Sequence, residues 1–434
     1  MQSPRAICLK LLDSTERGQE YSNIALDRAL KKYPDLRDID RRFISALYYG
    51  VLERRITLDA VIGKYSNRPS DKLSSELRQI LRMGIYQILY MDTVPESAAV
   101  NESVALAKGL RNQGASGFVN ALLRNFIRGG CKLPKSGVKL KDLSIEYSCP
   151  EWIVKSFIRD YGEETALSIL KNSIGRAPMT ARLNTCKSSL DEIISELASQ
   201  GVSCKLIPEA EACAELSGCG SVESLSAYQK GMLHIQDLSC QICCRELDPK
   251  AGETVLDLCS APGGKAFTIA ELMGDSGTVL AYDLHPNRVR LIAAGAERLG
   301  LKSITAAVNN AKILNEKIPL ADKVLCDVPC SGLGVMRRKP EIKYRPEEEL
   351  SALPKTQLEI LTTSSKYLKV GGELIYSTCT LRREENSDIV EKFLRENNDF
   401  ESVKLKGFTG YDITITPDRY GSDGFYIAKI RRKR

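Results

Sequence analysis

Hydrophobic residues in the first part of the chain recur at the spacing of an α-helix. Between residues 73 and 91 this repeat of three and four positions comprises Leu77, Ile80, Leu81, Gly84, Ile85, Ile88 and Leu89. Such a repeat places its members on one face of a helix. Because no strand-like alternation interrupts the helical pattern from residue 4 to about 128, we predict an all-α N-terminal domain over residues 1–130.

A linker is predicted directly after this helical region. The stretch "RGGCKLPKSG", residues 128–137, combines paired glycines, a proline and lysines, a composition typical of loops and linkers. Beyond it, residues 140–238 combine helical patterns at 151–174 and 190–201 with a strand candidate at 179–185 and shorter strands. We interpret this second region as a small α+β linking module.

From residue 239 onward strands and helices alternate regularly. The predicted strands are 254–258, 278–283, 304–308, 323–328 and 372–378. Predicted helices begin near Lys265, Asn287 and Pro354. Regular β-α alternation indicates a doubly wound, mostly parallel sheet, so we predict a Rossmann-like α/β domain over residues 239–434. Ligands of such sheets bind beyond the carboxyl ends of the strands.

Composition and charge agree with a globular protein of several domains. The chain has 434 residues, of which 43% are hydrophobic, and 62 Lys plus Arg against 55 Asp plus Glu give a net charge of +7. A mild excess of positive charge suits a polyanionic partner. No leader-like segment opens the chain and no apolar run approaches the roughly 20 residues that span a bilayer, so we expect a cytoplasmic protein without a membrane partner.

The 14 cysteines and two histidines limit the chemistry that is available. In a reducing cytoplasm the thiols are expected to be free. A zinc site could form from Cys240, Cys243 and Cys244, with His234 nearby. However, these cysteines fall at the spacing of one helix face, and no second C-x-x-C accompanies them. We therefore expect no metal site, and thiols and carboxylates should carry the chemistry.

The ends of the first three strands suggest a nucleoside-binding site. "CSAPGGKA", residues 259–266, supplies small residues and glycines at the start of a helix, without the G-x-G-x-x-G or P-loop pattern. Asp283 ends the second strand, where an acid binds ribose hydroxyls in related sheets, although an N-cap role is equally open. Asn309 or Asn310, after the third strand, could bond an adenine edge or form a polar turn. We expect His285 to be a turn residue.

A cysteine lies at the end of each of the fourth and fifth predicted strands: Cys330 follows Asp327, and Cys379 follows Ser377. A single such cysteine is most often a buried structural residue, but two at successive strand ends favour a role in catalysis. A thiolate that adds to carbon 6 of a pyrimidine activates carbon 5 for methylation. Asp327 suits hydrogen bonding to the base, and one thiol could assist removal of the carbon-5 proton. The residues alone leave open which thiol attacks.

The motifs resemble those of the bacterial RsmB (Sun/Fmu) family of RNA cytosine-5 methyltransferases. The similarity rests on "DLCSAPGGKA", "DVPCSGLGVMRRKPEIKYR" and "GGELIYSTCTLRREENSDIV", on "HIQDLSCQI" at 234–242, and on "VNESVALAKGLRNQGASGFVNALLRNFIR", which resembles a NusB-like domain. It spans nearly the whole chain. The resemblance implies S-adenosylmethionine-dependent methylation of a cytosine in 16S ribosomal RNA, single-stranded or flipped from its helix, by a protein expected to be a monomer.

The resemblance also implies roles for individual residues. Cys379 would be the nucleophile and Cys330 would assist product release, while Asp327 and Lys265 complete the catalytic set. The residues that would bind the cofactor are Cys259, Ser260, Ala261, Pro262, Gly263, Gly264, Lys265, Asp283, Arg288, Asn310 and Asp327. One departure is Asn310, where the family usually has aspartate. We expect this amide to weaken cofactor binding without abolishing it.

Several alternatives remain open. The enzyme could act on tRNA or another RNA, or the chain could be a non-catalytic ribosome assembly factor that retains a methyltransferase fold. The presence of both cysteines, the strand-end acids and Lys265 argues against such a loss of catalytic activity. The two thiols could form a redox pair, but they are 49 residues apart (379 − 330), whereas redox pairs commonly occupy a C-x-x-C. The helical domain could bind RNA phosphates or dock a protein.

Overall fold

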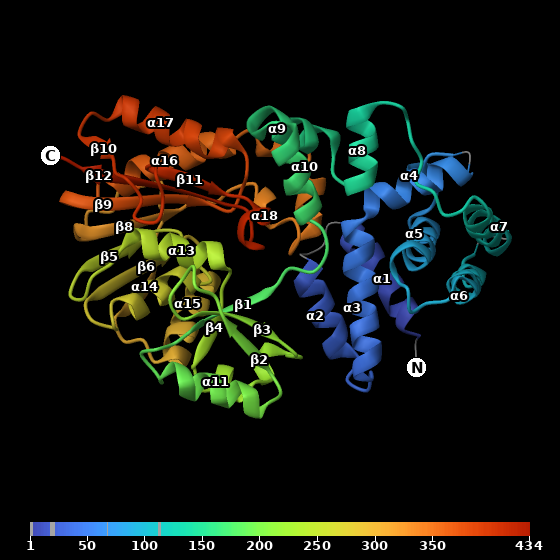
Figure 1. Ribbon diagram of the computed structural model, residues 1–434, viewed down its shortest axis with the longest axis horizontal. Coiled ribbons are helices and arrows are strands. Elements are labelled where there is room, and N and C mark those ends of the chain that lie inside the picture. The colour runs from blue at the N-terminus through green and yellow to red at the C-terminus, as the bar shows by residue number, and fades with distance from the viewer. Residues whose placement is uncertain (1–2, 18–21, 67, 112–113) are drawn as a thin grey trace. The chain divides into compact units, whose positions relative to one another are not determined.

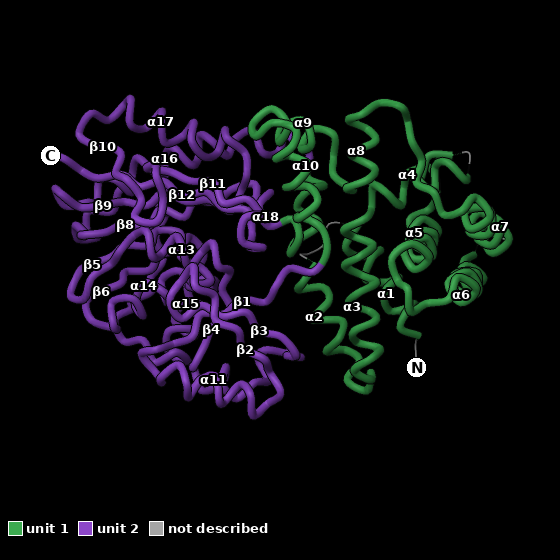
Figure 2. The backbone as a smooth tube through the Cα atoms, viewed as in Figure 1, with its two compact units in different colours: residues 1–175, 336–345 green, residues 176–335, 346–434 purple. Residues whose placement is uncertain are grey.

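The computed structural model describes residues 3–17, 22–66, 68–111 and 114–434. The chain forms two compact units (Figure 2). The first comprises residues 1–175 together with the short segment 336–345. The second comprises residues 176–335 and 346–434. Each unit is described separately below.

The first unit is helical throughout its described residues, as the periodicity predicted (Figure 1). Its α-helices are α1 (Pro4–Glu16), α2 (Ser22–Lys32), α3 (Asp38–Glu53), α4 (Arg55–Ser66), α5 (Ser75–Tyr90), α6 (Glu96–Lys108), α7 (Ala115–Arg128), α8 (Lys139–Tyr147), α9 (Glu151–Tyr161) and α10 (Glu163–Asn172). Two 3₁₀ turns, η1 (Ser70–Lys72) and η4 (Pro340–Tyr344), complete it.

The core of the first unit forms where the predicted hydrophobic faces meet. Ile80, Leu81 and Ile85 of α5 are fully buried and pack with Leu58 of α4 and Leu123 of α7. The helix α1 begins with a Ser-Pro pair, in which the Ser3 hydroxyl accepts a hydrogen bond from the Ala6 amide and Pro4 occupies the first helical position. Both features favour helix initiation at this residue.

An unexpected feature of this unit is the segment 336–345, which follows the second-unit residue Val335 in sequence but packs with the helices. The Lys343 ammonium group donates a hydrogen bond to the carbonyl of Glu53 at 2.7 Å, and the Tyr344 hydroxyl donates to the carbonyl of Leu52 at 2.8 Å. Both carbonyls lie in the last turn of α3, where intrahelical donors are lacking and positive charge is favoured.

The second unit begins with a small antiparallel sheet. Its four strands run in the order β2-β3-β1-β4, with bounds β1 (Met179–Leu183), β2 (Ser203–Leu206), β3 (Cys213–Ser217) and β4 (Leu233–Ile235). The helix α11 (Leu190–Ser199) buries Ile193 and Leu197 in one cluster with Ala181 and Leu183 of β1. A 3₁₀ turn, η2 (Val222–Ser224), and α12 (Ser226–Gln229) precede β4.

The larger sheet confirms the predicted doubly wound arrangement. Its strand order is β10-β12-β9-β8-β5-β6-β7, with β11 paired to β12. The strands from β9 to β7 in that order are parallel, and β12 joins β9 antiparallel. The strands are β5 (Thr254–Asp257), β6 (Thr278–Asp283), β7 (Ile304–Val308), β8 (Ala321–Asp327), β9 (Leu368–Thr378), β10 (Phe400–Ser402), β11 (Asp412–Ile415) and β12 (Phe425–Arg432).

Helices cover both faces of this sheet (Figure 1). On one face are α13 (Leu238–Leu247), α14 (Gly264–Leu272) and α15 (Pro286–Leu299); on the other are α16 (Leu353–Ser365) and α17 (Ser387–Glu396). The remaining short helices are η3 (Leu333–Val335), η5 (Glu347–Leu350), η6 (Arg383–Glu385) and α18 (Pro417–Tyr420).

Neighbouring residues of the central strands enter different cores. Leu325 packs with the first group of helices and Val324 with the second, and Ile375 and Leu374 divide in the same way. Successive side chains of a strand point to opposite faces, so a strand buried on both faces needs a continuous hydrophobic run. This requirement explains the uninterrupted apolar character of the predicted strands. Within the described part of the chain, no helix has the length and apolarity needed to cross a membrane.

Candidate active site

The predicted strand ends lie together because β5, β8 and β9 are adjacent and parallel. Asp327 at the end of β8 is paired in register with Ser377 of β9, and Asp257 of β5 with Leu325 of β8. Adjacent parallel strands carry their carboxyl ends to the same edge of the sheet. The sequence-predicted residues after β8 and β9 are therefore brought to one site.

The two strand-end thiols are in contact. The sulfur atoms of Cys330 and Cys379 are 3.3 Å apart, and both side chains are half-buried. The hydrogen bond with Cys379 raises the pKa of Cys330 well above its ordinary value, and burial raises it further. A raised pKa means that the Cys330 thiol stays protonated at neutral pH.

Asp327 is held by two donors on neighbouring elements. Its carboxylate accepts a hydrogen bond from the Lys265 ammonium group at 2.8 Å and another from the Ser377 hydroxyl at 2.8 Å. Burial would lower the pKa of Lys265, but the Asp327 carboxylate outweighs it and raises that pKa well above the usual value. Lys265 also lies 5.1 Å from the ring centroid of Phe425. Lys265 is therefore charged and fixed in position beside Asp327.

The loop that carries Cys330 is anchored by a buried carboxylate. Glu385 accepts hydrogen bonds from the Ser331 amide at 2.9 Å and from the Gln357 side chain at 2.8 Å. The same Gln357 amide donates to the carbonyl of Pro329 at 3.0 Å. These contacts fix the backbone on both sides of the Cys330 thiol.

A close backbone approach joins the two thiol-bearing loops. The Gly334 amide donates to the carbonyl of Cys379 at 2.9 Å, and the Gly424 amide donates to the carbonyl of Gly334 at 2.9 Å. A Cβ atom at position 334 would lie 1.9 Å from the Gly424 oxygen. Only glycine therefore fits at position 334, where the two loops approach each other.

Asp257 is a buried acid that the sequence analysis did not single out. It is 1% exposed, and both carboxylate oxygens lack a hydrogen-bond partner of ordinary geometry within the described residues. Burial, reinforced by the nearby charge of Asp327, raises its pKa to about 7. A buried acid without a fixed partner is costly, and such groups cluster at functional sites.

The glycine-containing turn after β5 is shaped for close approach. Gly263 precedes α14 with φ +110°, and a Cβ atom there would lie 2.4 Å from the Phe267 ring. Ser260, in the same turn, is buried with its hydroxyl unpaired among the described residues. The turn leaves the first amides of α14 at the strand edge, where backbone groups can approach a ligand.

Asp283 is not the N-cap of α15, since His285 occupies that position. Its carboxylate accepts from the His285 amide at 3.1 Å and pairs with Arg288 at 3.2 Å. Arg288 in turn donates to the carbonyl of Ala261 at 2.6 Å. This chain of contacts links the ends of β5 and β6. As expected, His285 is a turn residue, the N-cap position of α15.

The asparagines after β7 form a polar turn. The Asn310 side chain accepts from the Lys312 amide at 3.1 Å, and Asn309 accepts from Asn315 at 3.3 Å. The amide nitrogen of Asn309 is buried and lacks a partner among the described residues. The turn role is thus realised for Asn310, which stays half-exposed near the end of β7.

Cys240, Cys243 and Cys244 lie on α13, where Cys243 and Cys244 are fully buried in the core with Ile242 and Leu247. This placement agrees with the helix-face interpretation of their spacing. His234 lies 3.4 Å from Glu271, and the Thr268 hydroxyl lies 3.3 Å from the other ring nitrogen. These residues belong to a buried polar network.

Two residues of the site, Asp257 and Glu385, were missed in the sequence, and only the first had a recognisable signal there. Asp257 occupies the last position of its strand, as Asp283 and Asp327 do. Glu385 lies within a long matching motif but is fully buried, which only the tertiary structure reveals. Strand-end position was a usable signal for the first residue, while the anchoring role of the second depends on contacts distant in sequence.

The residues present fit the cofactor implied by the motif resemblance. A ribose needs an acceptor for its hydroxyl groups, which Asp283 supplies, and the methionine part carries an ammonium group, which suits the unpaired carboxylate of Asp257. The turn at Gly263 permits a close approach of the backbone. These residues therefore provide groups that suit the ribose and methionine parts of S-adenosylmethionine.

Comparison with known proteins agrees with the fold. A family model described as "16S rRNA methyltransferase RsmB/F" matches residues 244–431. The model of the NusB family matches residues 2–128, and a ferredoxin-like domain described as "Methyltr_RsmF/B-like" matches residues 149–223. The three matches follow the order of the helical region, the small sheet and the large sheet.

Full-length relatives are similar over the whole chain. The "probable ribosomal RNA small subunit methyltransferase B" of Bacillus subtilis is 37% identical over 99% of both chains. The protein of the same description from Synechocystis is 35% identical over 100% of both. The crystal structure of PH0851 superposes with a TM-score of 0.84 at 26% identity, covering 100% of this chain and 99% of that one. The chain therefore belongs to the RsmB/F family of 16S ribosomal RNA methyltransferases, enzymes whose cofactor is S-adenosylmethionine.

Proposed function

We propose that the protein methylates carbon 5 of a cytosine in 16S ribosomal RNA through a covalent bond between Cys379 and carbon 6 of the base. The observation that carries this proposal is the contact of two thiols, 3.3 Å apart, at strand ends adjoining the carboxylate of Asp327. A methyl transfer to a nitrogen or a hydroxyl group would need no such pair of thiols.

The residues proposed to hold the cofactor come from the first three strand ends. The turn from Cys259 to Lys265 and the carboxylate of Asp257 would bind its methionine part. Asp283, positioned by Arg288, would accept from the ribose hydroxyls, and Asn310 would lie toward the adenine. When bound, S-adenosylmethionine supplies an electrophilic methyl group. The remaining steps belong to residues of this chain.

Cys379 is the proposed nucleophile. The thiolate form of a cysteine is the nucleophile, and the raised pKa of Cys330 keeps that thiol protonated. We therefore assign the attack to Cys379, the role that the motif resemblance implies. Its sulfur adds to carbon 6, and the electron pair of the 5,6 double bond becomes available at carbon 5 to form the new carbon–carbon bond.

Asp327 would orient and activate the base. Its carboxylate can accept from the exocyclic amino group of cytosine and from a protonated N3, which stabilises the adduct. Lys265 and Ser377 fix the carboxylate while they leave lone pairs on its oxygens. Uracil presents a carbonyl in place of the amino group, and that oxygen would face the carboxylate unfavourably.

Cys330 would complete the reaction. Once the Cys379 sulfur is bonded to carbon 6, it no longer carries the charge that raises the pKa of Cys330. Cys330 can then lose its proton to solvent water and, as a thiolate, accept the proton from carbon 5. The electron pair of that C–H bond restores the 5,6 double bond, and the bond from carbon 6 to sulfur breaks with its electrons returning to Cys379.

The RNA must present an unstacked cytosine, because stacking in a helix shields carbon 6. We propose that the helical domain, residues 1–130, and the module at 140–238 bind the surrounding RNA, while residues 239–434 perform the chemistry. Lysine and arginine contacts to phosphates would supply affinity without selecting the sequence.

The proposal is tested by methyl transfer in vitro. Purified protein is incubated with 16S ribosomal RNA and cofactor carrying a labelled methyl group, and the RNA is digested to nucleosides. The label is expected in 5-methylcytidine, and transfer should fall at least about 1000-fold in Cys379→Ala. A label recovered in any other nucleoside would contradict the assignment of carbon 5, and tRNA as the better acceptor would change the substrate.

A further inference from the structure

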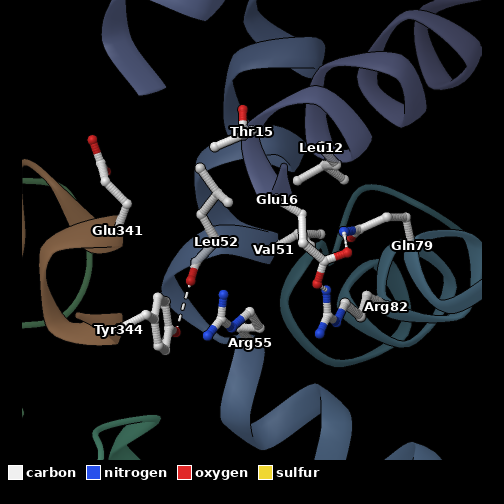
Figure 3. A pocket seen from close by; sticks show the side chains of 10 residues that line it. All are labelled: Leu12, Thr15, Glu16, Val51, Leu52, Arg55, Gln79, Arg82, Glu341 and Tyr344. Atoms are coloured by element: carbon white, nitrogen blue, oxygen red, sulfur yellow. Dashed lines mark hydrogen bonds and ion pairs between the residues drawn. The ribbon is translucent and has the colours of Figure 1, made fainter. Parts of the chain in front are cut away.

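A pocket of about 140 Å³ lies within the helical unit (Figure 3). It is lined by Leu12, Thr15, Glu16, Val51, Leu52, Arg55, Gln79, Arg82, Glu341 and Tyr344. These residues come from α1, α3, α4, α5 and the segment 336–345. A pocket lined by several charged side chains needs an account of how each charge is balanced.

Most of the charges around the pocket have partners. Arg82 is 4% exposed and forms ion pairs with Asp59 at 2.6 Å and with Glu16 at 2.9 Å. Glu16 also accepts from Arg78 at 2.9 Å. Burial would raise the pKa of Glu16, but the hydrogen bonds from the two arginines outweigh it and lower the pKa to about 2. Both acids are therefore fully committed to Arg78 and Arg82.

Arg55 differs from these arginines. Its guanidinium group stacks on the Tyr344 ring at 3.8 Å from the centroid, and it forms no hydrogen bond or ion pair with the residues that the structure describes. Figure 3 shows it between Tyr344 and the side chains of Glu16 and Arg82. Burial, with the repulsion of Arg82, lowers its pKa. The two acids beside it, Glu16 and Asp59, are already paired with Arg78 and Arg82.

The remaining polar groups of the lining are consistent with an exogenous anion. Glu341 has its carboxylate turned to Ser22, whose amide and hydroxyl donate to it at 3.1 and 2.8 Å. The side-chain oxygen of Gln79 is buried without a partner among the described residues. It can accept a hydrogen bond from a protonated phosphate oxygen. The stacked, planar guanidinium presents its fork of donors to the pocket, a geometry that matches phosphate.

We propose that this pocket binds a phosphate group through Arg55, with Arg82 and Gln79 at its sides. The phosphate comes either from the backbone of the RNA substrate or from free inorganic phosphate. The inference does not depend on the methyl-transfer chemistry proposed above, because none of its residues belongs to the active site. Stacking on Tyr344 holds the arginine in place and so reduces the entropy lost on binding.

The first test is calorimetric titration of the full-length protein with inorganic phosphate at constant ionic strength. Wild type is expected to bind saturably, and Arg55→Gln should weaken binding at least about tenfold, the loss expected for a charge-assisted hydrogen bond. Arg55→Lys, which keeps the charge but loses the fork, should weaken it less. Arg124→Gln, which removes an exposed arginine of α7, is the matched control and should leave affinity unchanged.

The second test distinguishes the two sources of phosphate. Affinity for a single-stranded oligoribonucleotide is measured against salt concentration. If the RNA backbone occupies the pocket, Arg55→Gln should reduce the slope of log K against log salt by about 0.7, the value for one phosphate contact on a single strand. An unchanged slope together with weakened phosphate binding would assign the site to free phosphate. Both results support the pocket as a phosphate site.

Two outcomes would overturn the proposal. One is the absence of saturable phosphate binding in folded wild type together with an unchanged RNA salt slope in Arg55→Gln. The other is phosphate binding by Arg55→Gln that is as tight as that of wild type. Circular dichroism confirms the fold of each variant.

Discussion

The sulfur atoms of Cys330 and Cys379 lie 3.3 Å apart, although 49 residues separate them in the sequence. The parallel pairing of β8 with β9 brings the two strand ends together, and the contact with Cys379 raises the pKa of Cys330. Cys379 is proposed to attack the base and Cys330 to permit its release. This division of roles has a direct chemical consequence.

Replacing Cys330 by alanine should trap the enzyme on its RNA. The attack by Cys379 would still occur, but removal of the carbon-5 proton would be slow, so a covalent protein–RNA adduct should accumulate. Denaturing gel electrophoresis measures it as a band of reduced mobility that disappears after nuclease treatment. Cys379→Ala should give no such band, and a band that persisted in this variant would reverse the assignment of the two thiols.

Asp327→Asn should lower kcat about 100-fold or more, the range for loss of a group that assists proton movement in the transition state. The amide side chain of this variant cannot form the ion pair with Lys265. Its NH₂ group is a hydrogen-bond donor and would face the amino group of the base, which is also a donor. Ser377→Ala is the matched control, since it removes one hydrogen bond to the same carboxylate and should cost no more than about tenfold. Steady-state kinetics measures both, and equal losses in the two variants would argue against a direct role for Asp327.

The affinity for S-adenosylmethionine should rise with pH between 6 and 8. The pKa of Asp257 is raised to about 7 by burial and by Asp327, so the acid is protonated at pH 6 and ionised at pH 8. Only the ionised form attracts the ammonium group of the cofactor. Below the pKa, affinity should change by up to about tenfold per pH unit.

Calorimetry across this pH range is the measurement. Asp257→Asn should bind more weakly at pH 8 and lose the dependence, while Ser260→Ala should retain it, because the hydroxyl does not titrate in this range. A wild-type affinity that stays constant from pH 6 to 8 would show that Asp257 does not contact the ammonium group.

Glu373 should contribute to the stability of the large sheet in a pH-dependent manner. It pairs with Lys323 at 2.7 Å, Lys429 at 2.9 Å and Arg431 at 2.8 Å. Burial would raise the pKa of Glu373, but hydrogen bonds from these cations outweigh the effect of burial and lower the pKa to about 2. Because the pKa is lower in the folded state, the stabilisation is present above the unfolded value of about 4.3 and is lost as pH falls toward 2.

Glu373→Gln should therefore lower the free energy of unfolding by about 3 kcal/mol at pH 7 and by about half as much at pH 3. Denaturant unfolding at the two pH values measures the difference. The exposed Glu401, 3.9 Å from Arg431, provides the control, since Glu401→Gln should change stability by less than about 1 kcal/mol. Equal losses at pH 7 and pH 3 for Glu373→Gln would contradict the lowered pKa.

Much of the fold could be predicted because its physical causes are local. The helical repeat around Ile80 and Leu81 marks a helix that buries one face, and the continuous apolar strands ending in Asp283 and Asp327 mark a sheet covered on both faces. Since parallel strands end at one edge, the residues that follow them could be placed at a common site before the structure was known.

What could not be predicted depends on contacts between segments distant in sequence. The 3.3 Å separation of the thiols requires the register of β8 against β9, and the anchoring of Ser331 by Glu385 spans 54 residues. The packing of 336–345 with the helical unit rests on single hydrogen bonds from Lys343 and Tyr344 to carbonyl groups of α3. Backbone acceptors of this kind leave no trace in the sequence.

The central claim, that Cys379 makes this protein a cytosine-5 methyltransferase of 16S ribosomal RNA, is tested most directly by bisulfite sequencing of that RNA. Cells that lack the gene are compared with the same cells carrying the wild-type gene or the Cys379→Ala gene. We predict one cytosine that resists conversion with the wild-type gene and is converted in the other two. Identical conversion of every cytosine in all three, or resistance that persists with Cys379→Ala, would contradict the account.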